Sequence, residues 1–401
     1  MVFKEAGRGS IMPQLIIPES VAIDDKHKLL GLDHLRAFAI VYVLLFHYKF
    51  FGHPAWELPI GVFGWTGVDL FFVLSGFLIA GQLFAGVAKG KPIAAREFFI
   101  KRFFRIIPPY FLVLILYFSF PALTEWGNLS PAWRYFTFTL NFGLDLRKYS
   151  TFSHAWSLCV EEQFYLVLPL CFWLLTRYNL GKNAWIVLVA LFIGGFIIRI
   201  YCWNHFVAPQ LSDNLRPLWN LYVYYPTYNR LDGLLVGVSI AGLFTFYPKV
   251  KAWVNQYSNL LILAGIAGLV GGYFICLEKE SFIAGTYGFP VISIAYGLIV
   301  AAAVCPNNVL YKFKSVVTAQ LAALSYSIYL VHKIVIHVTQ VQLGNLGMDK
   351  DSGMMMVCCF ATVILAALLM RYLVERPALR LRNKILKSEG RGQKTEVRRQ
   401  K

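Results

Sequence analysis

The chain has 401 residues, of which 58% are hydrophobic and only 15% are charged, and its mean hydropathy is +0.57. This composition excludes an ordinary soluble globular protein and is typical of a polytopic membrane protein. The formal net charge of +17 does not indicate nucleic-acid binding, because the lysines and arginines lie in short segments between apolar stretches and in the C-terminal tail, as the positive-inside rule describes.

Ten apolar segments are long enough to cross a bilayer and have helical rather than alternating character. Residues 1–28 precede them without an apolar signal-peptide core or a small-residue cleavage site, so we expect a retained first helix. The predicted fold is therefore an all-α polytopic membrane protein. Its expected membrane segments are approximately 29–51, 62–86, 103–121, 156–176, 184–203, 231–247, 258–277, 286–305, 316–340 and 354–374.

Basic residues predict the orientation of these segments. The connection 89–105 carries six basic residues against one acidic residue, and the tail 371–401 carries eleven against three. Ten spans place both stretches on one side of the membrane, which the positive-inside rule assigns to the cytoplasm. We therefore expect a cytoplasmic N-terminal segment (1–28), a transmembrane domain (29–380) and a basic cytoplasmic tail (381–401).

The first segment places Arg36 and His47 inside an apolar helix. They are eleven residues apart, which is three helical turns plus about 20°, so both side chains project from one face with about 16 Å of rise between them. With Arg36 at a membrane boundary, His47 lies just past the middle of a hydrocarbon layer about 30 Å thick. Polar side chains at that depth are usually functional.

The next two segments contribute an acid and an arginine pair. Asp69 is either a helix cap or a partner that orients His47 or Arg230. Arg102 and Arg105 are spaced i and i+3, so they share one helix face near the start of a segment. Such a pair either anchors the helix to lipid headgroups or binds the phosphates of an anionic cytoplasmic ligand.

The fourth segment begins HAWSLCVEEQFYLVLPL, which contains Trp156 and Ser157 followed by Glu161 and Glu162. Two successive acids in an apolar layer are hard to explain by packing alone. They project about 100° apart on a helix, so we expect them to face different environments, one pairing with an arginine and the other serving a site. The alternative for either acid is a structural salt bridge.

Later segments add Arg230, Asp232, Tyr326 and His332, for which helix packing and hydrogen bonding between helices are the simpler interpretations. We expect the ERP sequence that begins at Glu375 to stop its helix with local pairing. The seven cysteines are odd in number and lack metal-site spacing, so we expect buried thiols and no metal centre.

We expect these residues to form two groups according to their depth in the membrane. The cytoplasmic group contains Arg36, Arg102, Arg105 and Glu375 to Pro377. The outer group contains His47, Asp69, Glu161, Glu162, Arg230 and Asp232.

Together the motifs resemble acyltransferase family 3, a family of bacterial membrane-bound O-acetylases that modify lipopolysaccharide, capsule and other glycans. The resemblance covers approximately residues 29–380. It rests on the motifs Arg36-x10-His47, GVDLFFVLSGFLI, Arg102-x-x-Arg105 and HAWSLCVEEQFYLVLP. The motifs RLDGLLVG and LSYSIYLVH support it.

The resemblance implies that His47 is the essential catalytic histidine, that Arg36 is its motif partner, and that Arg102 and Arg105 bind acyl-CoA from the cytoplasm. It also implies that the protein binds no cofactor and uses acyl-CoA, by default acetyl-CoA, as co-substrate. The acceptor would be a glycan or glycolipid outside the membrane. We further expect a bacterial inner-membrane location and the stand-alone form of the family, without a C-terminal SGNH domain. Glu161 and Glu162 match the family's acidic pair. They join His47 and Arg36 as catalytic candidates. The supporting or acceptor-side candidates are Asp69, Trp156, Ser157, Arg230, Asp232, Tyr326 and His332.

Two other classes of protein fit the same residues. A multi-pass transporter would use the intramembrane charges for substrate or proton coupling, although the sequence shows no internal repeat of the kind many transporters have. A structural subunit of an envelope-polymer assembly is the second alternative.

Overall fold

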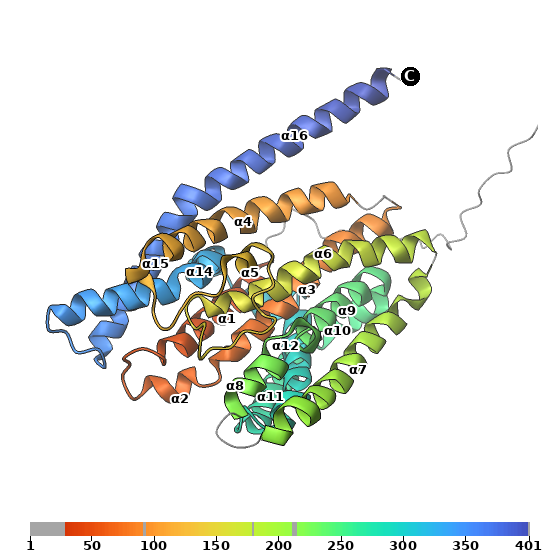
Figure 1. Ribbon diagram of the computed structural model, residues 1–401. Helices are drawn as coiled ribbons and strands as arrows, with labels where there is room; N and C mark the ends of the chain where they lie inside the picture. Colours follow the sequence, from red (N-terminus) through yellow and green to blue (C-terminus); the bar gives the residue numbers. More distant parts are fainter. Residues whose placement is uncertain (1–28, 91–93, 179, 211–214, 400–401) are drawn as a thin grey trace, which may run out of the picture.

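The computed structural model describes residues 29–90, 94–178, 180–210 and 215–399 (Figure 1). Within these ranges every regular element is a helix and no β-strand is present. The predicted all-α class is therefore confirmed. The expected N-terminal segment 1–28 lies outside the described residues.

Each of the ten predicted membrane segments coincides with a helix. These helices are α1 (Leu30–Tyr48), α3 (Gly67–Ala88), α4 (Ala95–Ser119), α6 (Trp156–Arg177), α7 (Ala184–Cys202), α9 (Asp232–Phe246), α11 (Ser258–Ile275), α12 (Phe289–Ala303), α14 (Val316–Asn345) and α15 (Gly353–Met370). The remaining α-helices are α2 (Glu57–Gly61), α5 (Ala132–Phe136), α8 (Leu215–Trp219), α10 (Pro248–Gln256), α13 (Val309–Lys312) and α16 (Arg376–Arg399).

By length and composition, eight helices of the described chain can cross a membrane, and nine if α9 and α10, which meet at 108°, form one bent span. The difference from the ten predicted segments lies at α4 and at this bent pair. Helix α4 is 25 residues long but is not among the eight, and its first half carries Lys101, Arg102 and Arg105. A polytopic membrane protein remains the architecture.

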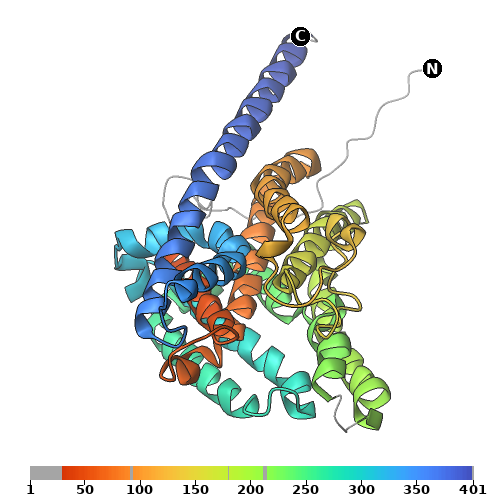
Figure 2. The ribbon, with the colours of Figure 1, turned by 60° about the vertical axis from the view of Figure 1, so that its left-hand side comes forward.

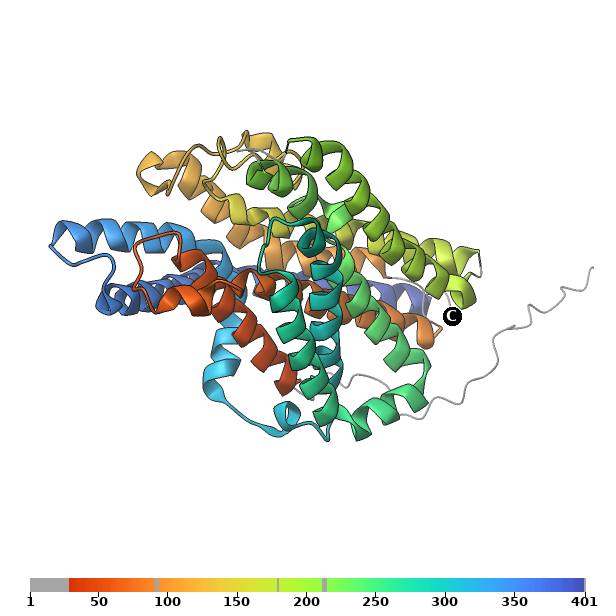
Figure 3. The ribbon, with the colours of Figure 1, turned by 90° about the horizontal axis from the view of Figure 1, so that it is seen from below.

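The centre of the bundle is built on α1 and α3. Helix α1 packs against α3 and α14, α3 packs against α9, and α11 and α12 lie side by side (Figure 3). Glycine allows the close approach of α3 and α9: a Cβ atom added at Gly76 would lie 2.2 Å from the carbonyl oxygen of Leu234, and one added at Gly237 would lie 2.2 Å from that of Val73. Small residues commonly permit such contacts between membrane helices.

The C-terminal part continues as a helix where we expected a stop. A π-helical turn, Arg371–Glu375, is followed directly by α16, which packs against α4 and then projects beyond the bundle (Figure 2). The expectation of a helix stop at the ERP sequence is therefore wrong. Pro377 lies just after the π-helical turn, where the regular hydrogen-bond ladder that a proline would interrupt is already altered.

Candidate functional site

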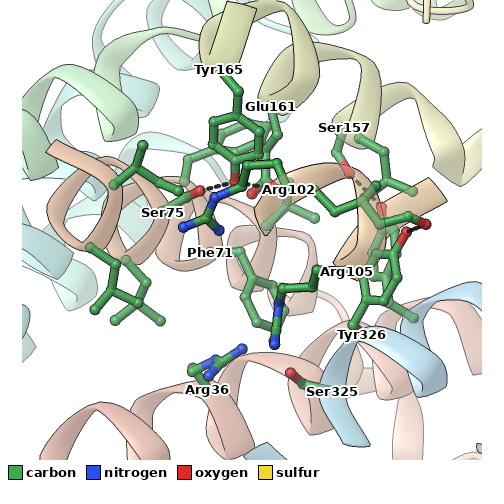
Figure 4. Close-up of a pocket in the computed structure, with 18 residues that line it drawn as sticks. Arg36, Phe71, Ser75, Arg102, Arg105, Ser157, Glu161, Tyr165, Ser325 and Tyr326 are labelled. Atoms are coloured by element: carbon green, nitrogen blue, oxygen red, sulfur yellow. Dashed lines mark hydrogen bonds between the residues drawn. The ribbon is translucent and has the colours of Figure 1, made fainter. Parts of the chain in front are cut away.

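Three arginines line a cavity of about 130 Å³ between α1, α3, α4, α6 and α14. Arg36 comes from α1, and Arg102 and Arg105 come from α4, as their shared helix face predicts. Figure 4 shows the guanidinium groups of Arg36 and Arg105 turned toward the same space. We call this space the arginine cavity. Its remaining charged lining residue among those described is Glu161.

Local contacts hold Arg102 and Glu161 in place. The Arg102 guanidinium lies 5.6 Å from the ring centre of Tyr165, and its Nη2 lies 3.5 Å from Oε1 of Gln82. The Tyr165 hydroxyl donates to Oε2 of Glu161 at 3.0 Å and is also hydrogen-bonded to Ser75 (Figure 4). With three cations and one carboxylate, this cavity favours an anionic ligand.

The two acids of α6 face different surroundings, as their 100° separation predicts. Glu161 lines the arginine cavity, whereas Glu162 does not. The expectation that Glu161 belongs with His47 in the outer group is therefore wrong. Helix α6 starts at Trp156, which lines a cavity together with His47, and five residues later, after a rise of about 7.5 Å, Glu161 lines the cavity of Arg36.

His47 lines a second cavity, of about 280 Å³, which we call the histidine cavity. Two more histidines pack near the ring of His47: the ring centre of His332 lies 4.8 Å from that of His47, and that of His154 lies 5.9 Å away. His154 and His332 are themselves 4.8 Å apart and are almost fully buried. Lys333 also lines this cavity.

Hydrogen bonding assigns the tautomer of His47. Its Nδ1 lies 3.0 Å from the carbonyl oxygen of Val43, one helical turn earlier. A carbonyl only accepts, so Nδ1 carries the proton and donates. Nε2 is then left with a free lone pair, which is the form that a general base requires. The Nδ1 of His332 is bound in the same way, 2.8 Å from the carbonyl oxygen of Tyr329.

The three histidines do not form a metal centre. Among the described residues, no group of three or more His, Cys, Asp or Glu side chains has an arrangement that could hold a metal ion. We therefore interpret the cluster through proton transfer and positioning.

The two cavities meet at Val68 and Tyr329, which line both of them. The Tyr329 hydroxyl lies 2.7 Å from the carbonyl oxygen of His154 and 2.6 Å from the Ser157 hydroxyl. Because the carbonyl only accepts, Tyr329 donates to it and accepts from Ser157. These bonds fix the phenol ring between the arginine cavity and the histidine cavity.

The other predicted site residues divide between these spaces and the packed core. Trp156 lines the histidine cavity, and Ser157 and Tyr326 line the arginine cavity. Tyr326 also donates to the carbonyl oxygen of Ile106 at 2.9 Å, which links α14 to α4.

Asp69, Arg230 and Asp232 line neither of these two cavities, so the structure does not support an acceptor-side role for them. Oδ1 of Asp69 accepts from Nη2 of Arg230 at 2.7 Å, and Oδ2 of Asp232 accepts from Nη1 of Arg199 at 2.6 Å. All four side chains are buried. Of the two partners expected for Asp69, the structure selects Arg230 and excludes His47.

Replacing Asp69 by alanine leaves the Arg230 cation buried and unpaired. We expect this variant to lose about 3–5 kcal/mol of stability, the usual result of breaking a buried ion pair from one side. Thermal unfolding in detergent measures the loss. The matched control is Asp145→Ala, which breaks the exposed pair with Arg147 and is expected to cost about 1 kcal/mol or less. Equal unfolding temperatures for the two variants would contradict the prediction.

Sequence analysis missed four residues of this site: His154, Lys279, Tyr329 and Lys333. His154 opens the HAWSLCVEEQ motif, so its position beside Trp156 was a usable signal. Lys279 lies in the loop after α11 and reaches the histidine cavity only through tertiary packing. No periodicity or spacing could have placed it there.

Fold and site together define a multi-pass helical membrane protein with two adjacent cavities, one lined by arginines and the other by histidines. The chain belongs to acyltransferase family 3, because residues 29–371 match the family model described as an acyltransferase domain. The predicted resemblance to this family is therefore confirmed.

Two relatives from Staphylococcus aureus illustrate the similarity. The O-acetyltransferase OatA of strain NCTC 8325 is 29% identical over 328 residues, which cover 75% of this chain and 49% of that protein. A putative O-acetyltransferase, SACOL0978 of strain COL, is 30% identical over 333 residues, 76% of this chain and 50% of that protein. The chain thus spans about half the length of these relatives. No solved structure gives a significant match.

Proposed function

We propose that this protein is an O-acyltransferase that moves an acyl group, by default acetyl, from cytoplasmic acyl-CoA to a hydroxyl of an extracytoplasmic glycan or glycolipid. The observation that carries the proposal is that the two cavities are neighbours, with Val68 and Tyr329 lining both of them. An arginine-lined chamber on one side and a histidine-lined chamber on the other provide separate places for an anionic donor and a hydroxyl acceptor. The names of the two relatives support acetyl as the transferred group.

The arginine cavity suits the donor. CoA carries phosphates, and guanidinium groups bind phosphate through paired, charge-assisted hydrogen bonds. Arg102 and Arg105 would hold these phosphates, and Arg36 would guide the pantetheine arm along α1. Arg36 and His47 are eleven residues apart on this helix, a rise of about 16 Å, which the flexible arm would cover to bring its thioester to the histidine cavity.

His47 supplies the chemistry that the acceptor needs. Its Nε2 takes the proton of the acceptor hydroxyl, and the hydroxyl oxygen attacks the thioester carbonyl carbon. The carbon–sulfur bond then breaks, CoA leaves as the thiolate, and the histidine returns the proton to sulfur. An ester and free CoA are the products.

The orientation follows from the distribution of charge. The basic start of α4 carries Arg96 and Lys101, and the basic α16 packs against this helix. Both adjoin the Arg36 side of the bundle, so the positive-inside rule places that side in the cytoplasm of a bacterial inner membrane. The His47 side, where the ring centre of Phe51 lies 4.5 Å from that of Trp126 in the 120–155 connection, then faces outward.

Release of free CoA distinguishes this activity from transport. Purified protein in proteoliposomes, given acetyl-CoA and an envelope glycan fraction, is expected to release CoA. The glycan should gain 42 Da per modified site, the net mass change when an acetyl group replaces a hydroxyl hydrogen. Mass spectrometry measures both products. Solute flux with no CoA release and no mass gain would favour the transporter alternative instead.

A further inference from the structure

Two lysines line the histidine cavity, and neither forms a salt bridge with a described residue. Lys333 is only 3% exposed and donates to the carbonyl oxygen of Ser150 at 3.3 Å. Lys279 enters from the loop between α11 and α12. Among the ion pairs of the described residues, neither ammonium group has a carboxylate partner. Lys333 is buried and Lys279 is partly buried, so an anion that enters this cavity and contacts their ammonium groups would be stabilised.

Aromatic rings hold both ammonium groups in position. Nζ of Lys279 lies 4.3 Å from the ring centre of Tyr224 and 4.9 Å from that of Trp65. Nζ of Lys333 lies 5.3 Å from the ring centre of Trp126. Cation–π contact of this kind fixes an ammonium group but leaves its N–H donors free for a ligand.

Two carboxylates lie near these lysines without forming a salt bridge: Glu280 near Lys279 and Glu125 near Lys333. Arg216 and Glu280 are the other charged residues of the histidine cavity, and they face each other, with Nε and Oε1 3.5 Å apart. Burial lowers the pKa of Lys279 to about 7, because removal from water disfavours the charged amine. A bound anion would favour the charged form again.

We propose that the acceptor is an anionic glycan, whose carboxylate or phosphate binds Lys279 and Lys333 while its sugar ring packs on Trp126 and Trp156. The inference rests on the proposed function and adds the chemical class of the acceptor. The anion places the sugar in the cavity that His47 lines, so charge selects the acceptor and the histidine activates its hydroxyl. A neutral glycan would leave both ammonium groups unpaired.

Labelled acetate reveals the charge of the acceptor, whatever the sugar sequence of the glycan. Cells that contain the protein, and matched cells with His47→Ala, are fed radioactive acetate, and their purified glycans are passed over an anion exchanger at pH 7. We expect the His47-dependent label to be retained. Release of the label at pH 2 identifies a carboxylate, which is then protonated, and continued retention identifies a phosphate.

The alternative results separate the two claims. His47-dependent label in the unretained fraction overturns the anionic acceptor and leaves the proposed function standing. No His47-dependent label in any fraction overturns the proposed function, and the inference with it.

Kinetics of lysine variants give a second test, with the retained glycan fraction as acceptor. We expect Lys279→Gln and Lys333→Gln to raise the KM for this glycan about tenfold or more, with the KM for acetyl-CoA unchanged, which also shows that the variants are folded. Lys279→Arg keeps the charge and is expected to restore most of the affinity. Lys148→Gln, at an exposed lysine outside the cavity, is the matched control. Wild-type KM values in both glutamine variants would overturn the inference.

Discussion

Purified protein with His47→Ala is expected to transfer acetyl groups from acetyl-CoA about 10²- to 10⁴-fold more slowly than the wild type, because a general base usually contributes a factor of this size. The reason is structural: Nδ1 of His47 donates to the Val43 carbonyl at 3.0 Å, so Nε2 alone can accept the acceptor's proton. Alanine removes this base. The rate of CoA release with a saturating acceptor measures the effect.

A matched histidine controls for the general effect of such a substitution. His205 is exposed, stacks on Tyr201 with ring centres 4.1 Å apart, and lines neither the arginine cavity nor the histidine cavity. We expect His205→Ala to keep the wild-type rate. Transfer by His47→Ala at the wild-type rate would remove His47 from the reaction.

Arg102→Ala and Arg105→Ala are expected to raise the KM for acetyl-CoA about tenfold or more each, because each removes charge-assisted hydrogen bonds to phosphate. Both side chains line the arginine cavity. If their contacts are the same in the ground state and the transition state, KM rises while kcat stays close to that of the wild type. Steady-state kinetics with varied acetyl-CoA measure both constants.

Lys101 offers the control for these arginine variants. It lies on the same helix but pairs with Glu97, 2.6 Å away, and is 44% exposed. It does not line the arginine cavity, so Lys101→Ala is expected to leave the KM for acetyl-CoA unchanged. Unchanged KM values in the arginine variants would return Arg102 and Arg105 to the role of headgroup anchors.

Periodicity predicted the parts of this site that depend on one helix. The eleven-residue spacing of Arg36 and His47 and the i, i+3 spacing of Arg102 and Arg105 follow from helical geometry alone. The apolar segments indicated the positions of all ten long helices for the same reason, since membrane thickness sets their length.

Contacts between distant segments were harder to predict. Sequence left Asp69 with two possible partners, and only the packing of α3 against α9 brings it to Arg230. The grouping of Glu161 with His47 was wrong because depth was judged from the position of the α6 segment and not from the cavity that the side chain lines. Lys279 comes from a loop, whose course no helical period describes.

Vesicles of opposite orientation test the central claim, that the acyl group passes from the arginine cavity to the histidine cavity across the membrane. Acetyl-CoA does not cross a bilayer unaided, so labelled acetyl-CoA is added outside sealed everted vesicles, which expose the cytoplasmic side, and outside sealed right-side-out vesicles. We expect His47-dependent labelling of glycan only in everted vesicles, with the labelled glycan enclosed. Equal labelling in both orientations, or labelled glycan on the same side as the added acetyl-CoA, would contradict transfer through the two cavities.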